Sequence, residues 1–351
     1  MLQLSETVMT ELAVHFVGNQ NQGGKIELSD ALFEPSPEVE IALIQYFLKP
    51  FGKAEVSYKL HTPEAGEKLE DNPIFAACQS IFADADTLFD QSVKLANHLF
   101  AQSQHPHIKP GEFFIAKLSD AVLEGELVDA VGIFKAERKE SFLRFGAQPT
   151  QLSLLEGINV GKLDKGVLIF NTEAQNGYRV AVVDANNYDT HYWNDDFLTL
   201  RIDQNESFQT KAVMDLCQDF VKESPELQED KAEQMVFLSK SVDYLKNHDN
   251  FEMEEFAKEV LPQPEAAEEL LHFKKSYEAN HEVELRDDFE IAQPAVKTLK
   301  KQVKSSINLD TNIQIKLDFD QAESARQFLE KGYDQEKNMY YYKVYFNQEM
   351  G

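Results

Sequence analysis

Hydrophobic and polar side chains follow a two-residue period through the middle of the chain, between residues 111 and 200. The alternation is visible from residue 113 to 117 and from 131 to 135, and turn-forming residues separate the successive runs. A two-residue period is typical of strands that bury one face, and short intervening turns favour antiparallel neighbours. The pattern therefore predicts an antiparallel meander in this block.

The segment before this block predicts one further hairpin and two helical regions. Leu12–Val17 and Lys25–Leu28 flank a polar, glycine-containing turn, which favours a hairpin. Ser36 and Pro37 form a helix start, and Pro50 ends that helix. A second helical region begins at Asn72-Pro73, where apolar residues recur at helical spacing for about seven turns.

Near residues 203–207 the hydrophobic period changes from two residues to a helical one. Helices are expected at 208–221, 229–245, 251–260, 265–278 and 294–303, followed by strands at 313–319 and 339–346 that flank a helical turn within 321–330. The sequence thus predicts an α+β protein. Residues 1–205 form an N-terminal domain with an antiparallel sheet and packed helices, and residues 206–351 form a mostly helical domain that ends in a small β-hairpin-like element.

Five segments, in this order and spacing, resemble a known family. They are Ile26–Pro35, Leu163–Ile169, Tyr192–Leu198, Leu299–Lys304 and Ile313–Phe319. Together they are similar to the bacterial nucleoid-associated proteins called NdpA-like. The resemblance implies a protein that is associated with the nucleoid, and it supplies no established catalytic residue.

The charge of the chain conflicts with simple DNA coating. There are 34 basic and 61 acidic residues, which give a net charge of −27. The acidity is spread along the chain, since residues 1–205 hold 16 basic and 30 acidic residues and residues 206–351 hold 18 and 31. DNA binding is driven mainly by Lys and Arg that replace counterions on phosphates. The chain should therefore be repelled by DNA unless a basic face is segregated.

Motifs for catalysis, cofactors and metals are weak. His105 and His107 lack a third ligand at suitable spacing, and the oxygen-rich loop 184–196 departs from a calcium loop at Tyr188 and lacks its glycine. Neither a phosphate-binding loop nor a nucleophile elbow is found. Cys78 and Cys217 are expected to be buried free thiols. We therefore expect no enzyme, no cofactor and no metal.

Two basic clusters stand out as candidate contacts with phosphates. Solvated charged surface is the alternative interpretation of both. A third candidate is a partner surface anchored by Tyr192 and Trp193, although these rings can equally pack beneath their loop. The residues of the clusters are Lys297, Lys300, Lys301 and Lys304 on the last helix, and Lys135, Arg138, Lys139 and Arg144 on the central hairpin.

The sequence favours a non-enzymatic, nucleoid-associated protein that reaches chromosomal DNA through a protein partner, such as a basic DNA-handling enzyme. Two alternatives stay open: a direct nonspecific DNA binder that uses the basic clusters, and an acidic mimic of DNA that regulates a DNA-handling enzyme. A cytoplasmic, nucleoid location is expected, because no signal peptide or apolar run of about 20 residues is evident. A homo-oligomer is also open.

Overall fold

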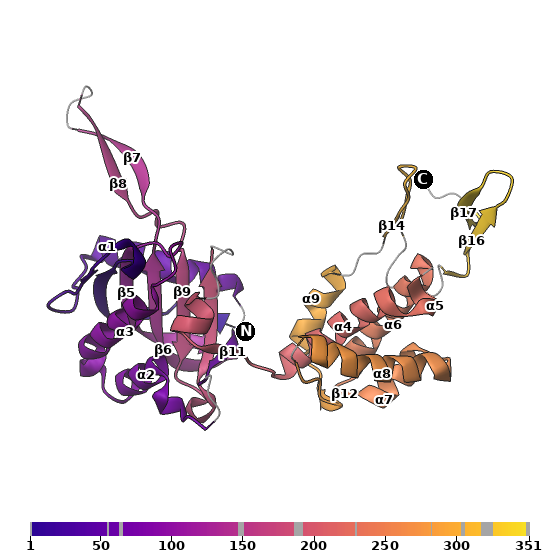
Figure 1. Ribbon diagram of the computed structural model, residues 1–351, viewed down its shortest axis with the longest axis horizontal. Helices are drawn as coiled ribbons and strands as arrows, with labels where there is room; N and C mark the ends of the chain where they lie inside the picture. The colour runs from indigo at the N-terminus through magenta and orange to yellow at the C-terminus, as the bar shows by residue number, and fades with distance from the viewer. Residues whose placement is uncertain are drawn as a thin grey trace. The chain divides into compact units, whose positions relative to one another are not determined.

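The computed structural model describes residues 2–54, 56–62, 66–146, 151–185, 192–228, 230–281, 283–302, 306–316 and 326–348. The chain forms two compact units, Met1–Asp203 and Gln204–Gly351 (Figure 1). A large antiparallel sheet dominates the first unit and helices dominate the second. The predicted α+β class is therefore confirmed, and the division falls next to the expected boundary at residue 205.

The first unit is built on a nine-stranded sheet in which every pairing between described strands is antiparallel. The strand order is β11-β4-β10-β9-β6-β5-β2-β3, and β1 pairs with β5. The predicted N-terminal hairpin is present as β2 and β3. The strands are β1 (Leu2–Gln3), β2 (Val8–Val17), β3 (Ile26–Glu27), β4 (Val56–Leu60), β5 (Gly111–Leu123), β6 (Glu126–Ala136), β9 (Lys165–Phe170), β10 (Arg179–Asp184) and β11 (Leu200–Ile202).

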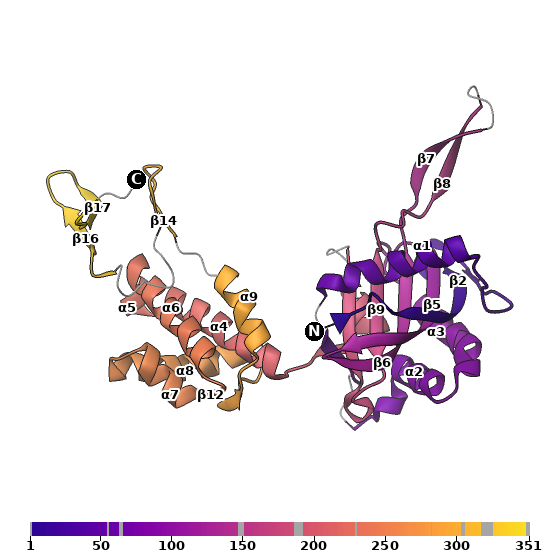
Figure 2. The same ribbon diagram turned by 180° about the vertical axis from the view of Figure 1, so that it is seen from behind.

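Helices cover both faces of this sheet (Figure 2). On one face, α2 (Pro73–Ala83) and α3 (Leu88–Gln102) bury a core of aliphatic and aromatic side chains that includes Trp193. On the other face, α1 (Pro37–Leu48) and the 3₁₀ turn Lys49–Lys53 bury a core rich in phenylalanine. In that second core the rings of Phe47 and Phe134 stack with 4.1 Å between their centroids. The sheet is thus the middle layer of the unit.

The helical region that the sequence predicts after Asn72 is two helices rather than one. Asn72 begins α2 by accepting hydrogen bonds from the amides of Ile74 and Phe75. At Asp84 the backbone becomes extended, and its carboxylate accepts a hydrogen bond from the amide of Asp86. Aspartate competes well for backbone donors in this way, so it ends one helix and begins the turn that leads to α3.

Two further strands of the first unit form a separate arm. β7 (Glu140–Phe145) and β8 (Leu152–Gly157) pair with each other, and neither pairs with the large sheet within the described residues. The arm projects from the body of the unit (Figure 1). All six residues of β7 are exposed. The sequence analysis predicts these strands but not their separation from the sheet.

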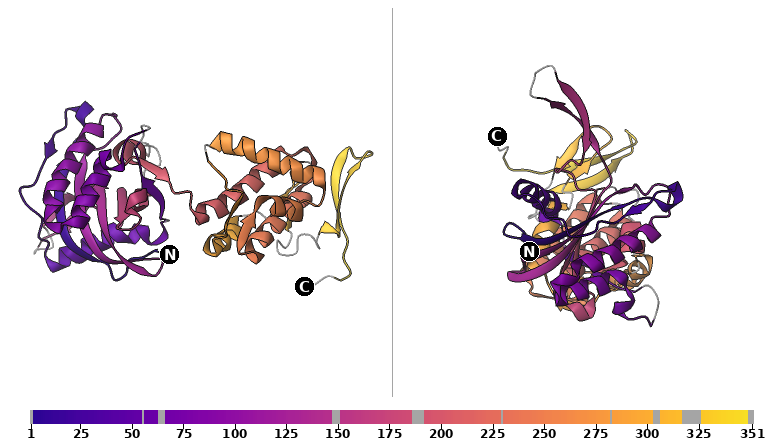
Figure 3. Two further views of the ribbon diagram at one scale, coloured as in Figure 1. Left: turned by 90° about the horizontal axis from the view of Figure 1, so that it is seen from below. Right: turned by 90° about the vertical axis from the view of Figure 1, so that its left-hand side faces the viewer.

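The second unit packs its helices around an apolar core (Figure 3). Its elements are α4 (Glu206–Glu223), α5 (Pro225–Gln228), α6 (Lys231–Asn247), β12 (Asn250–Glu252), α7 (Met253–Val260), α8 (Pro264–His281), β13 (Asp288–Glu290), α9 (Gln293–Gln302), β14 (Ser306–Asn308), β15 (Gln314–Lys316), β16 (Leu329–Asp334) and β17 (Met339–Val344). Within the described ranges, no helix combines the length and the hydropathy of a transmembrane segment.

The C-terminal β element differs from the predicted one. The expected strands 313–319 and 339–346 do not pair with each other in the described part of the chain. Instead β15 pairs with β14, and β17 pairs with β16. The helical turn expected within 321–330 is wrong at its end, because residues 329 and 330 begin β16. Residues 317–319 and 321–325 lie outside the described residues.

We expect a fragment of residues 1–205 to fold without the rest of the chain. It contains all nine strands of the large sheet and the helices that cover both faces, and helices gain most of their stability from such packing. Thermal unfolding and amide chemical-shift dispersion of the fragment would test this expectation. A molten or aggregated fragment would mean that the second unit completes the same core.

Candidate functional site

Three members of the central basic cluster lie at the base of the arm, and the first of them, Lys135, is buried. Lys135 on β6 is paired in register with Lys165 on β9, and both are 0% exposed. Their Nζ atoms lie 5.4 and 4.9 Å from the centroid of the Tyr192 ring. This is a correction to the sequence analysis, which treats Lys135 as part of an exposed cluster. A residue without exposed surface cannot contact a phosphate in this conformation.

Carboxylates compensate both buried lysines. Lys135 Nζ lies 3.1 Å from a carboxylate oxygen of Glu137 and donates to the carbonyl of Lys109 at 2.8 Å. The Tyr192 hydroxyl donates to the same Glu137 at 2.6 Å. Lys165 Nζ pairs with Asp184 at 2.7 Å. Burial lowers the pKa of Lys135, while the neighbouring Glu137 carboxylate opposes this shift.

Asp164 anchors the segment through which the chain enters the arm. Its carboxylate accepts hydrogen bonds from the amides of Glu137 and Arg138, at 2.7 and 3.0 Å. The Arg138 guanidinium closes an ion pair with the other oxygen of Asp164 at 2.8 Å. Asp164 is buried, and burial together with Asp164 and Glu112 raises the pKa of the nearby Tyr46 hydroxyl. The base of the arm is therefore a hydrogen-bonded charge network that fixes the exit of β6.

The remaining basic residues of this cluster do not form a common basic face. Lys139 pairs with Glu112 at 2.7 Å, as Arg138 does with Asp164, although both basic side chains are nearly half exposed. Arg144 lies on β7 of the arm and is exposed. Within the described ranges no ion pair involves Arg144. The four predicted contacts thus divide into one buried lysine, two paired side chains and one exposed arginine.

Tyr192 and Trp193 lie in the interior of the first unit. They begin a short π-helix, Tyr192–Phe197, and are 5% and 0% exposed. The Trp193 ring packs against Phe197 with 5.0 Å between the centroids. The interpretation of these two residues as an exposed partner anchor is therefore wrong, and the alternative that they pack beneath their loop agrees with the structure.

The second basic cluster lies on α9, in the other unit. Lys297 is exposed on this helix. Lys300 and Lys301 belong to the same helix, which places them one turn further along. Lys304 lies outside the described residues. The helical spacing that the sequence indicates is thus present over the described part of the cluster.

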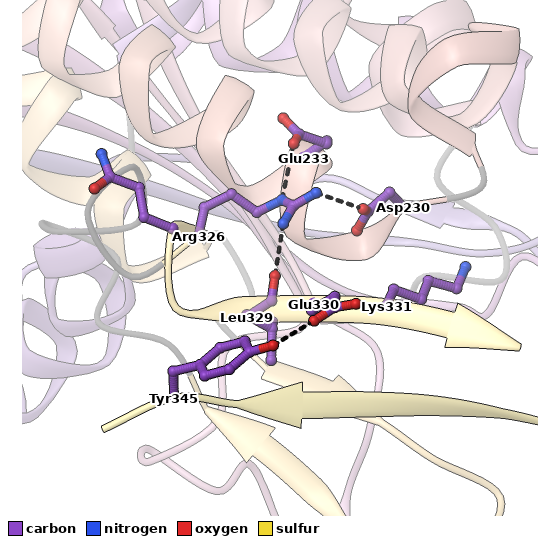
Figure 4. Close-up of a pocket in the computed structure, with 8 residues that line it drawn as sticks. Asp230, Glu233, Arg326, Leu329, Glu330, Lys331 and Tyr345 are labelled. Carbon is purple, nitrogen blue, oxygen red and sulfur yellow. Dashed lines mark hydrogen bonds and ion pairs between the residues drawn. The ribbon is translucent and has the colours of Figure 1, made fainter. Parts of the chain in front are cut away.

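Figure 4 shows a hollow between β16 and the start of α6, lined by charged side chains. Arg326 pairs with Asp230 at 3.1 Å and with Glu233 at 2.8 Å, and it donates to the carbonyl of Leu329 at 2.6 Å. The Tyr345 hydroxyl donates to Glu330 at 2.7 Å. Because two carboxylates already engage Arg326, the hollow holds the hairpin against α6 and offers little to an anionic ligand.

The candidate metal ligands do not come together in a site within the described ranges. No group of three or more His, Cys, Asp or Glu residues there could hold a metal ion. The rings of His105 and His107 are neighbours, with centroids 4.9 Å apart. In the oxygen-rich loop, Asp184 is the ion-pair partner of Lys165, and residues 186–191 lie outside the described residues. Cys78 and Cys217 are free and buried, and burial raises the pKa of the Cys217 thiol to about 12.

Comparison with known proteins identifies a family. The family model described as nucleoid-associated protein YejK matches residues 13–340, which include most of the large sheet, the arm and most of the second unit. Among curated proteins, none matches the chain.

Proposed function

Because the chain belongs to the YejK family of nucleoid-associated proteins, we propose that a protein partner tethers it to the chromosome and that it acts without catalysis. Membership of this family supports an association with the nucleoid. The protein tether, the absence of catalysis and the location at the nucleoid are our inferences.

The observation that supports a protein tether is that most basic side chains of the central cluster are paired with carboxylates, in a chain that is acidic overall. The net charge is −27, and among the described residues Arg144 is the one exposed side chain of the central basic cluster without an ion pair. Affinity for the phosphate backbone comes mainly from basic groups that replace its counterions. Lys135, Arg138 and Lys139 are instead engaged by carboxylates of the same unit. Direct affinity for DNA should therefore be low.

An acidic surface favours a partner with a basic one. Complementary charge accelerates association and excludes partners of like charge. Proteins that handle DNA carry basic surfaces for phosphate contacts, so they combine the required charge with a position on the chromosome. We therefore propose a basic DNA-handling protein as the tether. The second candidate is direct phosphate contact through α9, which the exposed Lys297 favours.

The purified chain should bind random duplex DNA with a dissociation constant no tighter than about 10⁻⁵ M at physiological salt. The reason is the repulsion between the polyanionic duplex and a chain of net charge −27. Fluorescence anisotropy of a labelled duplex, repeated over a series of salt concentrations, would measure the constant and the number of ion contacts. Sub-micromolar binding at physiological salt would contradict a protein tether.

The second basic cluster supplies the matched control for this measurement. A variant with Lys297, Lys300, Lys301 and Lys304 replaced by glutamine should lose the residual salt-dependent binding, and the same positions replaced by arginine should retain it. Equal residual binding of the two variants would assign the cluster to ordinary solvated surface.

A further inference from the structure

The arm presents a sheet face that nothing in its own unit covers. Residues paired across an antiparallel ladder lie on the same face of it. Leu143 is paired with Leu154, and Phe145 with Leu152, so these four side chains form one apolar face. They are 60%, 66%, 68% and 53% exposed, in the order given. The opposite face is mixed: it carries the pair Arg144–Ser153 and the pair Phe142–Leu155, of which Phe142 is 50% exposed and Leu155 is half-buried.

A two-stranded hairpin with one bare apolar face needs a cover. An isolated hairpin of this size is marginally stable in water, and stable examples add a further layer or strand. The network around Asp164 fixes only the base of the arm. A cover that stabilises the arm in every folded molecule has to be available wherever the chain folds. A second copy of the chain meets this condition.

The chemistry of the arm argues against nucleic acid as the cover. Its two strands carry Glu140, Glu156 and Arg144, so acidic residues outnumber the basic one. On this face the pair Ser141–Glu156 follows the four apolar side chains toward the base of the arm, so the one charge on it is that of a carboxylate. Phosphates would therefore gain nothing from this face, whereas an identical face from a second copy offers the same leucine and phenylalanine side chains.

We propose that two copies of the chain associate through their arms, with the face formed by Leu143, Phe145, Leu152 and Leu154 of one copy packed against the same face of the other. Such a contact is self-complementary and is closed by a two-fold axis. With Arg144 on the opposite face, the two arginines point away from the contact and do not repel each other.

The area of this contact is that of a weak, transient dimer. Each of the four side chains exposes on the order of 100 Å², and the two faces with their strand backbones remove roughly 1,000 Å² from water. This lies below the roughly 1,200–2,000 Å² of stable specific interfaces and close to the threshold of about 1,000 Å² for a weak, transient one. The dimer should therefore dissociate in the micromolar range rather than the nanomolar range.

Sedimentation equilibrium of the full chain tests the proposal. The wild-type chain should pass from monomer to dimer as its concentration rises through the micromolar range. Leu154→Lys should raise the dissociation constant at least tenfold, because it places a lysine from each copy in the contact. Ser153→Lys adds the same charge one residue away, on the opposite face, and should change the constant less than twofold. Purely monomeric wild-type chain at high micromolar concentration would overturn the proposal, as would equal effects of the two variants.

A cross-linking measurement covers the case in which Leu154→Lys unfolds the arm. Both native cysteines are buried, so an added cysteine on the arm is the accessible thiol. With a bismaleimide, Leu154→Cys should give covalent dimers and Ser153→Cys should give few. Equal yields from the two variants would place the contact elsewhere and overturn the proposal.

Discussion

Replacing Asp184 with alanine should lower the free energy of unfolding of the first unit by about 3–5 kcal/mol. The side chains of Lys165 and Asp184 are 1% and 6% exposed, and they meet at 2.7 Å. Removing the carboxylate leaves the buried ammonium of Lys165 without its closest counter-charge. The in-register neighbour Lys135 is another cation, so it cannot replace the lost negative charge. Urea unfolding of wild type and variant, followed by far-ultraviolet circular dichroism, would measure the difference.

Two further variants separate this effect from general damage. The double variant Lys165→Met, Asp184→Leu should recover most of the lost stability, because a buried ion pair can be replaced by apolar groups of similar volume at little cost. Lys162→Ala breaks a solvent-exposed pair with Glu140 and should leave the unfolding midpoint nearly unchanged. If Asp184→Ala changed the stability as little as Lys162→Ala, the pair of Lys165 and Asp184 would be hydrated. That result would contradict the burial of this charge network.

The burial of Lys135 could have been predicted from its neighbours. Val131, Ile133 and Lys135 are spaced two residues apart on one strand, so they share a face, and Val131 and Ile133 are core residues. Residue type favours the surface for a lysine, whereas strand geometry places this one inside. The carboxylates that make burial tolerable, those of Glu137 and Asp164, come from the loops next to strand ends, and a period-two pattern does not reveal that they lie near Lys135.

Local patterns also account for what was predicted and what was missed in the fold. The meander follows directly from alternation. β4 was missed although Val56, Tyr58 and Leu60 alternate, because a five-residue strand between a helix and a loop carries little signal. The break at Asp84 depends on one carboxylate that binds a backbone amide. Short apolar strands on either side of a turn predict the arm as a hairpin, but they do not reveal whether another layer covers it.

If a protein tethers the chain, much more of it should co-sediment with intact nucleoids than with the same DNA after its proteins are removed. Purified chain should co-sediment at least tenfold more with gently isolated nucleoids than with an equal mass of the same DNA after its proteins are removed, because the acidic surface repels bare phosphates and binds a basic protein. This ratio, measured at physiological salt, tests the central claim most directly. A ratio of ten or more supports a protein tether. Equal retention on intact and deproteinised nucleoids would contradict it and assign the association to DNA itself.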